Sequence, residues 1–243
     1  MAHALVWIAV FAAIAGVSRE AHADPGGFYA RNASAIWDKI AGAPPAIKLK
    51  LVSPDGKSHV LAHNDPDKGV VLEVGGRIGS HDVDLGAGVG SELLWSPNSE
   101  AFAVTTSDDG ANGHYRTIVV ISHPGGAITK DLSPLVEAVF GHPVRCGWPE
   151  DPNVGAVHWV DSAKLVVAAE IVAHSNCDSF GTFRAYEIDL ERMRVTRSFD
   201  QIAAKHIFGP ALGLELRNAP DECVRSPRRC WVSTNHPSEA SHD

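Results

Sequence analysis

The chain has 243 residues, with 29 acidic and 21 basic side chains and a formal net charge of −8. Its hydrophobic fraction of 44% and charged fraction of 21% are typical of a globular protein, and they exclude collagens, coiled coils and multi-span membrane proteins. The 22 glycines and 15 prolines interrupt the chain often, which favours many short strands over long helices. The negative charge disfavours nucleic acids and anionic membrane surfaces as partners.

The N-terminus has the features of a secretory signal. An uncharged apolar run extends from Ala4 to Val17, and Ala21-His22-Ala23 supplies the small residues of a cleavage site. The run is too short to cross the ~30 Å hydrocarbon core of a membrane as a helix. We therefore expect a signal peptide at 1–23 and a single mature domain at 24–243, secreted or periplasmic, with no transmembrane segment after cleavage. A retained membrane anchor is the alternative, because no lysine or arginine precedes the apolar run.

All four cysteines follow the predicted signal, so they would enter an oxidising compartment in which disulfides persist. Four cysteines allow three pairings, and short loops close most easily, which favours Cys146–Cys177 and Cys223–Cys230. The second bridge would make 219–243 a disulfide-bearing C-terminal segment. A metal site is the competing interpretation, but there is no C-x-x-C pair, so none is predicted.

After the signal, a helix is predicted first. Ala33, Ile36, Trp37 and Ile40 recur at helical spacing, which predicts a short helix within 28–40. From there on, brief apolar runs alternate with turn residues, and each run predicts a strand. The predicted strands are Lys48–Val52, Ser58–Ala62, Val70–Val74, Glu92–Trp95, Ala101–Thr106, Thr117–Ser122, Val157–Val160, Leu165–Ala173, Phe183–Leu190 and Arg194–Ser198.

Two further short helices are predicted among the strands. One covers Pro134–Phe140 after Ser133 as its cap, and the other covers Gln201–Phe208 between Asp200 and Gly209. Because strands dominate, we expect an all-β domain.

Two segments of the chain are similar to each other. Residues 92–104 read ELLWSPNSEAFAV and residues 156–168 read AVHWVDSAKLVVA. Each segment is followed by a strand that opens with an aromatic-arginine pair, Tyr115-Arg116 in the first and Phe183-Arg184 in the second. This similarity predicts one supersecondary unit used twice.

The first unit resembles a blade of the TolB-like and WD40-like β-propellers. In 92–122 a strand is followed by a Trp-Ser-Pro-Asn-Ser turn, an apolar strand, an acidic loop and another apolar strand, and 156–190 matches more loosely. The resemblance implies repeated antiparallel blades that cover one another's faces, so that middle strands can be apolar throughout. A third blade could cover 47–83. Since a closed ring needs at least four blades of ~40–50 residues, the ring could be incomplete. A sandwich that reuses a common hairpin turn is the alternative.

The motifs of common catalytic and cofactor sites are missing from the sequence. No G-x-S-x-G elbow occurs, and no helix follows the glycine-rich run Gly86–Ser91 to bind a phosphate. The 13 histidines show no H-E-x-x-H or H-x-H spacing. We therefore predict no catalytic residue, no cofactor and no metal.

Two polar loops are the best candidates for ligand or cation binding. Oxygen-rich stretches could supply ligands to a cation, although Asx- and Gly-rich hairpin loops explain them equally well. The stretch Asn64–Asp67 has the same character. The candidate binding residues are Asp108, Asp109, Asn112, His114, His174 and Asp178.

The function predicted from the sequence is that of an exported, non-catalytic binding module of propeller-like type. Trp148, Tyr115 and Phe180 lie in predicted loops and could anchor a protein or a small ligand. Two alternatives stay open. The first is an exported hydrolase or lyase with a His/Asp site in the blade loops, and the second is a structural protein of the cell envelope.

Overall fold

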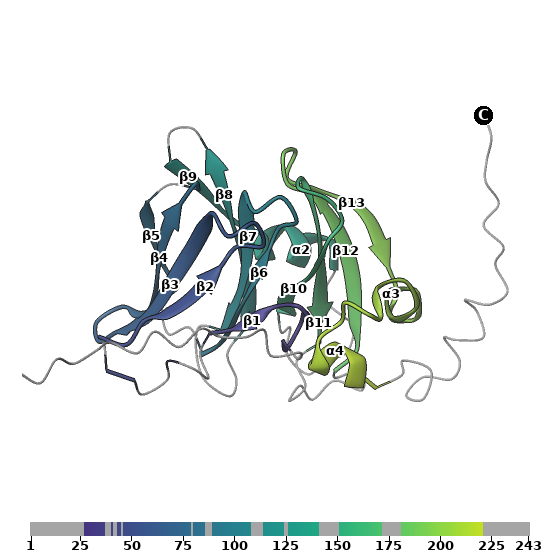
Figure 1. The fold of residues 1–243 in the computed structure, drawn as a ribbon. Helices are drawn as coiled ribbons and strands as arrows, with labels where there is room; N and C mark the ends of the chain where they lie inside the picture. Colours follow the sequence, from purple (N-terminus) through teal and green to yellow (C-terminus); the bar gives the residue numbers. More distant parts are fainter. Residues whose placement is uncertain are drawn as a thin grey trace, which may run out of the picture.

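The computed structural model describes residues 27–36, 40, 43–44, 46–78, 80–85, 89–107, 114–123, 126–140, 151–171 and 181–220. Three antiparallel sheets stand side by side over these residues, and two short helices lie beyond the third sheet (Figure 1). The all-β class predicted from the sequence is therefore confirmed. No closed barrel or propeller is seen in this part of the chain.

Each sheet is built from strands that follow one another along the chain and pair with their neighbours. The first sheet has the order β2 (Leu49–Val52), β3 (Ser58–Asp65), β4 (Gly69–Gly76) and β5 (His81–Asp84). The second has the order β1 (Ser34–Ala35), β6 (Val89–Trp95), β7 (Ala101–Ser107), β8 (Tyr115–His123) and β9 (Gly126–Asp131). The third has the order β10 (Asn153–Trp159), β11 (Lys164–Glu170), β12 (Phe183–Asp189) and β13 (Arg194–Phe199).

The second sheet is buried on both faces. Successive side chains of a strand point to opposite faces, and on β7 the residues Phe102 and Val104 join the core shared with the first sheet. Ala101 and Ala103 instead join the core shared with the third sheet. Strand β11 is enclosed in the same way, since Leu165–Ala169 is 0% exposed. This two-sided burial explains why these strands are apolar at every position.

The turns after the two tryptophans are closed by their own polar side chains. Ser96 Oγ donates to Asn98 Oδ1 at 2.8 Å and accepts the Ala101 N–H at 3.0 Å. In the third sheet, Asp161 Oδ1 accepts the Ala163 N–H at 2.8 Å. The bonds to the Ala101 and Ala163 N–H groups satisfy backbone donors of the two turns, and the bond to Asn98 holds Ser96 in place.

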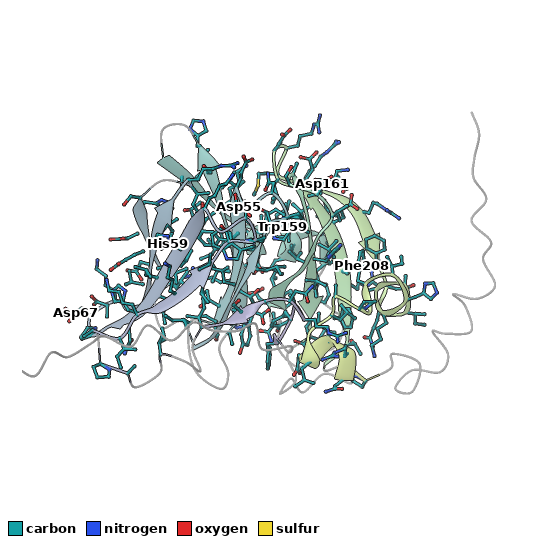
Figure 2. All side chains as sticks on the ribbon, viewed as in Figure 1. Asp55, His59, Asp67, Trp159, Asp161 and Phe208 are labelled. Atoms are coloured by element: carbon teal, nitrogen blue, oxygen red, sulfur yellow. The ribbon has the colours of Figure 1, made fainter. Side chains whose placement is uncertain are left out.

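The tryptophan of the third sheet connects it to the second. Trp159 is 4% exposed and lies between the two sheets (Figure 2). Its indole Nε1–H donates to the Leu94 carbonyl at 3.1 Å. Trp159 therefore contributes both apolar area and a directed hydrogen bond to this interface.

The helices whose bounds the structure describes are α2 (Ser133–Phe140), α3 (Gln201–Phe208) and α4 (Leu214–Asn218). The first two confirm the sequence prediction, and Asp200 caps α3 by accepting the Ala203 N–H at 2.8 Å. Helix α4 was not predicted. Residues of α3 and α4 pack on the outer face of the third sheet. There the rings of Phe208 and Phe199 lie edge to face, with their centroids 5.1 Å apart. None of the described helices is long and apolar enough to cross a membrane.

The predicted helix at 28–40 is wrong over its first part. Ala30 forms a bridge with Leu212, and β1 pairs with β6 through Ser34 and Leu93. The helical spacing did identify residues that are buried, because Ala33, Ile36 and Ile40 are all at most 1% exposed. Long-range strand pairing overrides the local helical pattern at 28–35. Residues 37–39 lie outside the described part, and Ile40, the last residue of the predicted helix, is helical.

Candidate functional site

A group of buried polar side chains lies where residues 27–36, here called the N-terminal strap, cross the ends of the second and third sheets. We call Tyr29, Glu92, Asn153 and Glu170 the carboxylate cluster. The two sheets meet at this end, because the Tyr115 N–H donates to Asn153 Oδ1 at 3.1 Å. The cluster therefore joins three parts of the chain that are distant in sequence.

Glu92 binds the backbone of the strap. Its carboxylate accepts the N–H groups of Phe28 at 2.5 Å, Tyr29 at 3.1 Å and Ala30 at 3.1 Å. The side chain is 3% exposed. Gly27 permits this approach, since a Cβ there would lie 2.9 Å from Glu92 Oε2 and 2.0 Å from the Ala30 carbonyl oxygen. Glu92 thus supplies acceptors for three consecutive amides that have no strand partner.

Tyr29 connects Glu92 to the third sheet. Its side chain is 0% exposed, and its hydroxyl donates to Glu170 Oε2 at 2.9 Å. The ring lies directly on Gly155 of β10, where a Cβ would be 2.1 Å from Tyr29 Cγ. The Tyr29 carbonyl accepts the Gly213 N–H at 2.7 Å just before α4. The backbone, the hydroxyl and one face of the ring of Tyr29 are therefore each held by a contact.

Glu170 is the less satisfied of the two carboxylates. It is 2% exposed, and its Oε1 has no hydrogen-bond partner among the described residues. Burial and the nearby Glu215 raise the pKa of Glu170 to about 7, against the lowering effect of Tyr29 and Asn153. Burial likewise raises the pKa of Glu92 to about 7, although its three amide donors lower it. Burial and Glu170 together raise the pKa of Tyr29 well above its ordinary value.

An aromatic surface lies beside the cluster. Phe28 is 40% exposed and stacks on Tyr115, with ring centroids 5.5 Å apart and an interplanar angle of 19°. The rings of Tyr115 and Tyr29 also lie against each other, with their centroids 5.3 Å apart. Gly90 has a φ of +65°, and a Cβ there would lie 2.3 Å from the Tyr115 hydroxyl, so glycine is required at this position. This arrangement places one of the three predicted anchors, Tyr115, next to a partly exposed phenylalanine.

The chemistry open to the cluster is limited by its burial. Two carboxyl groups with a pKa of about 7 could exchange protons near neutral pH. However, both are almost inaccessible to solvent, and their hydrogen bonds go to the chain's own backbone and to Tyr29. Structural ion and hydrogen-bond networks perturb pKa values in the same way as active sites do. The cluster therefore acts first as the attachment point of the strap.

Of the candidate binding residues, only His114 lies in the described part, and it is an exposed residue directly before β8. Asp108, Asp109, Asn112, His174 and Asp178 lie outside the described residues. The residues that flank both predicted loops do lie at the end of the sheets where the cluster is, because Ser107 pairs with Tyr115 and Glu170 pairs with Phe183. Among the described residues, no three His, Cys, Asp or Glu side chains are placed to bind a metal ion.

Several other predictions fall outside the described residues. These are the signal peptide at 1–23, Trp148, Phe180, and the disulfides Cys146–Cys177 and Cys223–Cys230. The oxygen-rich stretch at 64–67 is described, and Asp65 Oδ1 accepts the N–H groups of Asp67 at 2.9 Å and Lys68 at 3.0 Å. This stretch is therefore an Asx-type turn between β3 and β4.

No motif in the sequence marks Glu92, Glu170 or Tyr29. A signal was nevertheless present, since Glu92 directly precedes Leu93-Leu94-Trp95 and Glu170 ends the apolar run from Leu165. An acidic residue inside or at the end of a continuously apolar strand is buried together with its neighbours and needs hydrogen-bond donors. The sequence could not show that residues 28–30 supply those donors to Glu92.

The chain was compared with family models, curated proteins and solved structures, and none of the three comparisons gave a match. Its function is therefore inferred from its own residues and contacts.

Proposed function

We propose that this chain is an exported, non-catalytic binding module with a propeller-like architecture. The observation that carries the architecture is the row of three up-and-down sheets, of which the second is buried on both faces. Four-stranded antiparallel sheets that stack face to face are the units from which propellers are built. Each sheet here contains four consecutive strands, and β1 adds a short fifth strand to the second sheet.

The binding surface that we propose consists of Phe28, Tyr115 and Leu214, here called the aromatic platform. Phe28 and Leu214 are 40% and 53% exposed, and the Leu214 N–H donates to the Gly27 carbonyl at 3.0 Å, which brings α4 next to the stacked rings. Exposed aromatic and aliphatic side chains held on a rigid base are typical anchors of protein interfaces. The platform therefore suits a protein partner that offers an apolar side chain.

The non-catalytic part of the proposal is supported by the state of the most perturbed acids. Glu92 and Glu170 are 3% and 2% exposed, and their hydrogen bonds fix the strap. A general acid or base must come within hydrogen-bond reach of a substrate proton. Carboxylates that are enclosed and already bonded are better suited to supporting the platform from below.

A photo-crosslinking experiment tests the platform. A photoreactive phenylalanine analogue at Phe28 should give one discrete adduct with an envelope protein in the source cells, whereas the same analogue at Ile202 should give none. Ile202 is a matched control because it is 55% exposed but lies on α3. The adduct should disappear in a Leu214→Ser background. Equal labelling at both positions, or labelling that survives Leu214→Ser, would refute the platform.

Export is tested separately. Fractionation followed by N-terminal sequencing should find a chain that begins at Asp24 in the periplasm or the medium. An intact N-terminus on a cytoplasmic chain would contradict this part of the proposal.

A second candidate function, an exported hydrolase or lyase, is favoured by one observation. The described residues that flank both predicted polar loops lie at the same end of the sheets, which would bring His114 and the loop carboxylates toward each other. A panel of chromogenic esters, glycosides and peptides separates the two functions. Turnover that is lost in Asp109→Asn but kept in Phe28→Ser would establish the enzyme and reject the non-catalytic module.

A further inference from the structure

Both buried carboxylates act on the same residue of the N-terminal strap. Glu92 accepts the Tyr29 N–H at 3.1 Å, and Glu170 accepts the Tyr29 hydroxyl at 2.9 Å. The strap is otherwise attached by backbone hydrogen bonds, including Arg31 N–H to the Ala211 carbonyl at 2.8 Å and Ile36 N–H to the Ser91 carbonyl at 2.8 Å. The charge state of these carboxylates therefore bears directly on whether the strap stays in place.

We propose that the N-terminal strap is a proton-sensitive latch, which is closed when Glu170 carries a proton and loosened when Glu170 loses it. Opening would release Tyr29 from its site against Gly155 and remove the support of Phe28 in the aromatic platform. The inference does not depend on the platform being a binding site.

The geometry assigns this role to Glu170 and not to Glu92. Three amide donors of the strap converge on Glu92 and lower its pKa, so the charged form of Glu92 favours the closed strap. Glu170 receives the Tyr29 hydroxyl on Oε2 and also has a side-chain hydrogen bond with Asn153, while its Oε1 has no hydrogen-bond partner in the described structure. Loss of the proton from Glu170 therefore leaves a negative charge on a buried oxygen without a donor, a state that proteins avoid.

The titratable groups around Glu170 and Tyr29 oppose the negative charge of an ionised Glu170. Glu215 on α4 acts on Glu170 and on Tyr29, and Tyr115 on β8 acts on Tyr29. Glu92 accepts the Tyr29 N–H at 3.1 Å. All of these groups are acids, so the ionisation of any of them adds negative charge around Glu170.

The direction of the pH dependence follows from the raised pKa. Glu170 has a pKa of about 7 in the closed state, against 4.5 for an ordinary glutamate. Closing raises the pKa of Glu170, so proton binding to Glu170 stabilises the closed state. This stabilisation is complete when the pH is below the pKa of the open state, and it is lost as the pH rises through about 7. Proton linkage between these two values gives about a tenfold shift of the latch equilibrium toward opening between pH 6 and pH 8.

Hydrogen exchange on the purified full-length chain measures this equilibrium. After correction for the intrinsic rates at each pH, protection of the Tyr29, Arg31 and Ile36 amides should fall about tenfold from pH 6 to pH 8. The Val167 amide in the middle of β11 should show no comparable change and serves as an internal reference.

Three variants identify the responsible group. Glu170→Gln should abolish the fall in strap protection between pH 6 and pH 8, whereas Glu191→Gln, which removes an exposed carboxylate on the β12–β13 hairpin, should keep it. Glu92→Gln should weaken the strap at both pH values but keep a fall in protection from pH 6 to pH 8. A Glu170→Gln chain with unchanged pH dependence would overturn the proposal.

A measurement on the unmodified chain keeps the proposal testable if Glu170→Gln does not fold. Carbon-13 NMR of the glutamate carboxyl groups should show Glu170 titrating near pH 7, together with shifts of the strap amides. Titration of Glu170 near its ordinary value, or strap protection that does not vary with pH, would equally overturn the latch.

Discussion

Two adjacent valines of β8 test the two-sided burial of the second sheet. Val119 and Val120 are 0% and 1% exposed, but Val119 packs against the third sheet and Val120 against the first. Replacing a buried valine by alanine loses about 1.6 kcal/mol of transfer free energy, and the cavity left behind raises the loss to about 2–3 kcal/mol. Because both faces are covered, Val119→Ala and Val120→Ala should lower the free energy of unfolding by similar amounts.

Urea unfolding followed by tryptophan fluorescence measures both variants, with Val52→Ala as the matched control. Val52 is 49% exposed on β2, so its truncation should change the free energy of unfolding by less than about 0.5 kcal/mol. The midpoints of the two buried variants should fall at an unchanged m value, which indicates the same surface exposed on unfolding. If either one behaves like Val52→Ala, that face of the sheet is open to solvent and the stacked arrangement is refuted.

Three further substitutions probe single contacts by the same unfolding assay. Asp200→Ala removes the cap of α3 and should lower the free energy of unfolding by about 1 kcal/mol, so an unchanged midpoint would contradict the capping role. Gly155→Ala places a Cβ 2.1 Å from Cγ of Tyr29 and should cost about 2–3 kcal/mol; a neutral effect would mean that the ring does not lie on this glycine. Trp159→Phe leaves the Leu94 carbonyl without its indole donor and should lower the free energy of unfolding by about 1–2 kcal/mol. A variant as stable as the parent would show that this hydrogen bond does not contribute.

Ten of the 13 described strands could be predicted because their side chains carry a strong local signal. Continuous apolar runs such as Leu165–Ala169 are long enough to identify, and turn residues mark their ends. The predicted strand Leu165–Ala173 was nevertheless too long, because β11 ends at Glu170. Strands β1, β5 and β9 were missed, since their side chains are mostly exposed or half-buried and carry no apolar alternation. Each of them is an edge strand held by backbone pairing with one neighbour, as β9 is with β8, and side-chain patterns do not report this pairing.

The carboxylate cluster could not be predicted from sequence because each contact joins distant segments. The bond between Tyr29 and Glu170 spans 141 residues, and those between the strap and Glu92 span 62–64 residues. The spacing of apolar residues instead favoured a helix at 28–40. This spacing reports which residues are apolar, but it does not report which groups accept hydrogen bonds from the backbone amides. The same pattern correctly marked Ala33 and Ile36 as buried.

The joining of the strap to the segment around α4 also constrains the order in which the chain can fold. The carbonyl groups of Gly27, Phe28 and Tyr29 accept the N–H groups of Leu214, Glu215 and Gly213. The first and the last described segments are thus hydrogen-bonded to each other. Closing so large a loop reduces the conformational entropy of the chain before any stabilising contact between its ends can form. A chain that emerges from the ribosome with its N-terminus first cannot complete this closure until Glu215 is available, so the strap is among the last parts to find its place although it is made first.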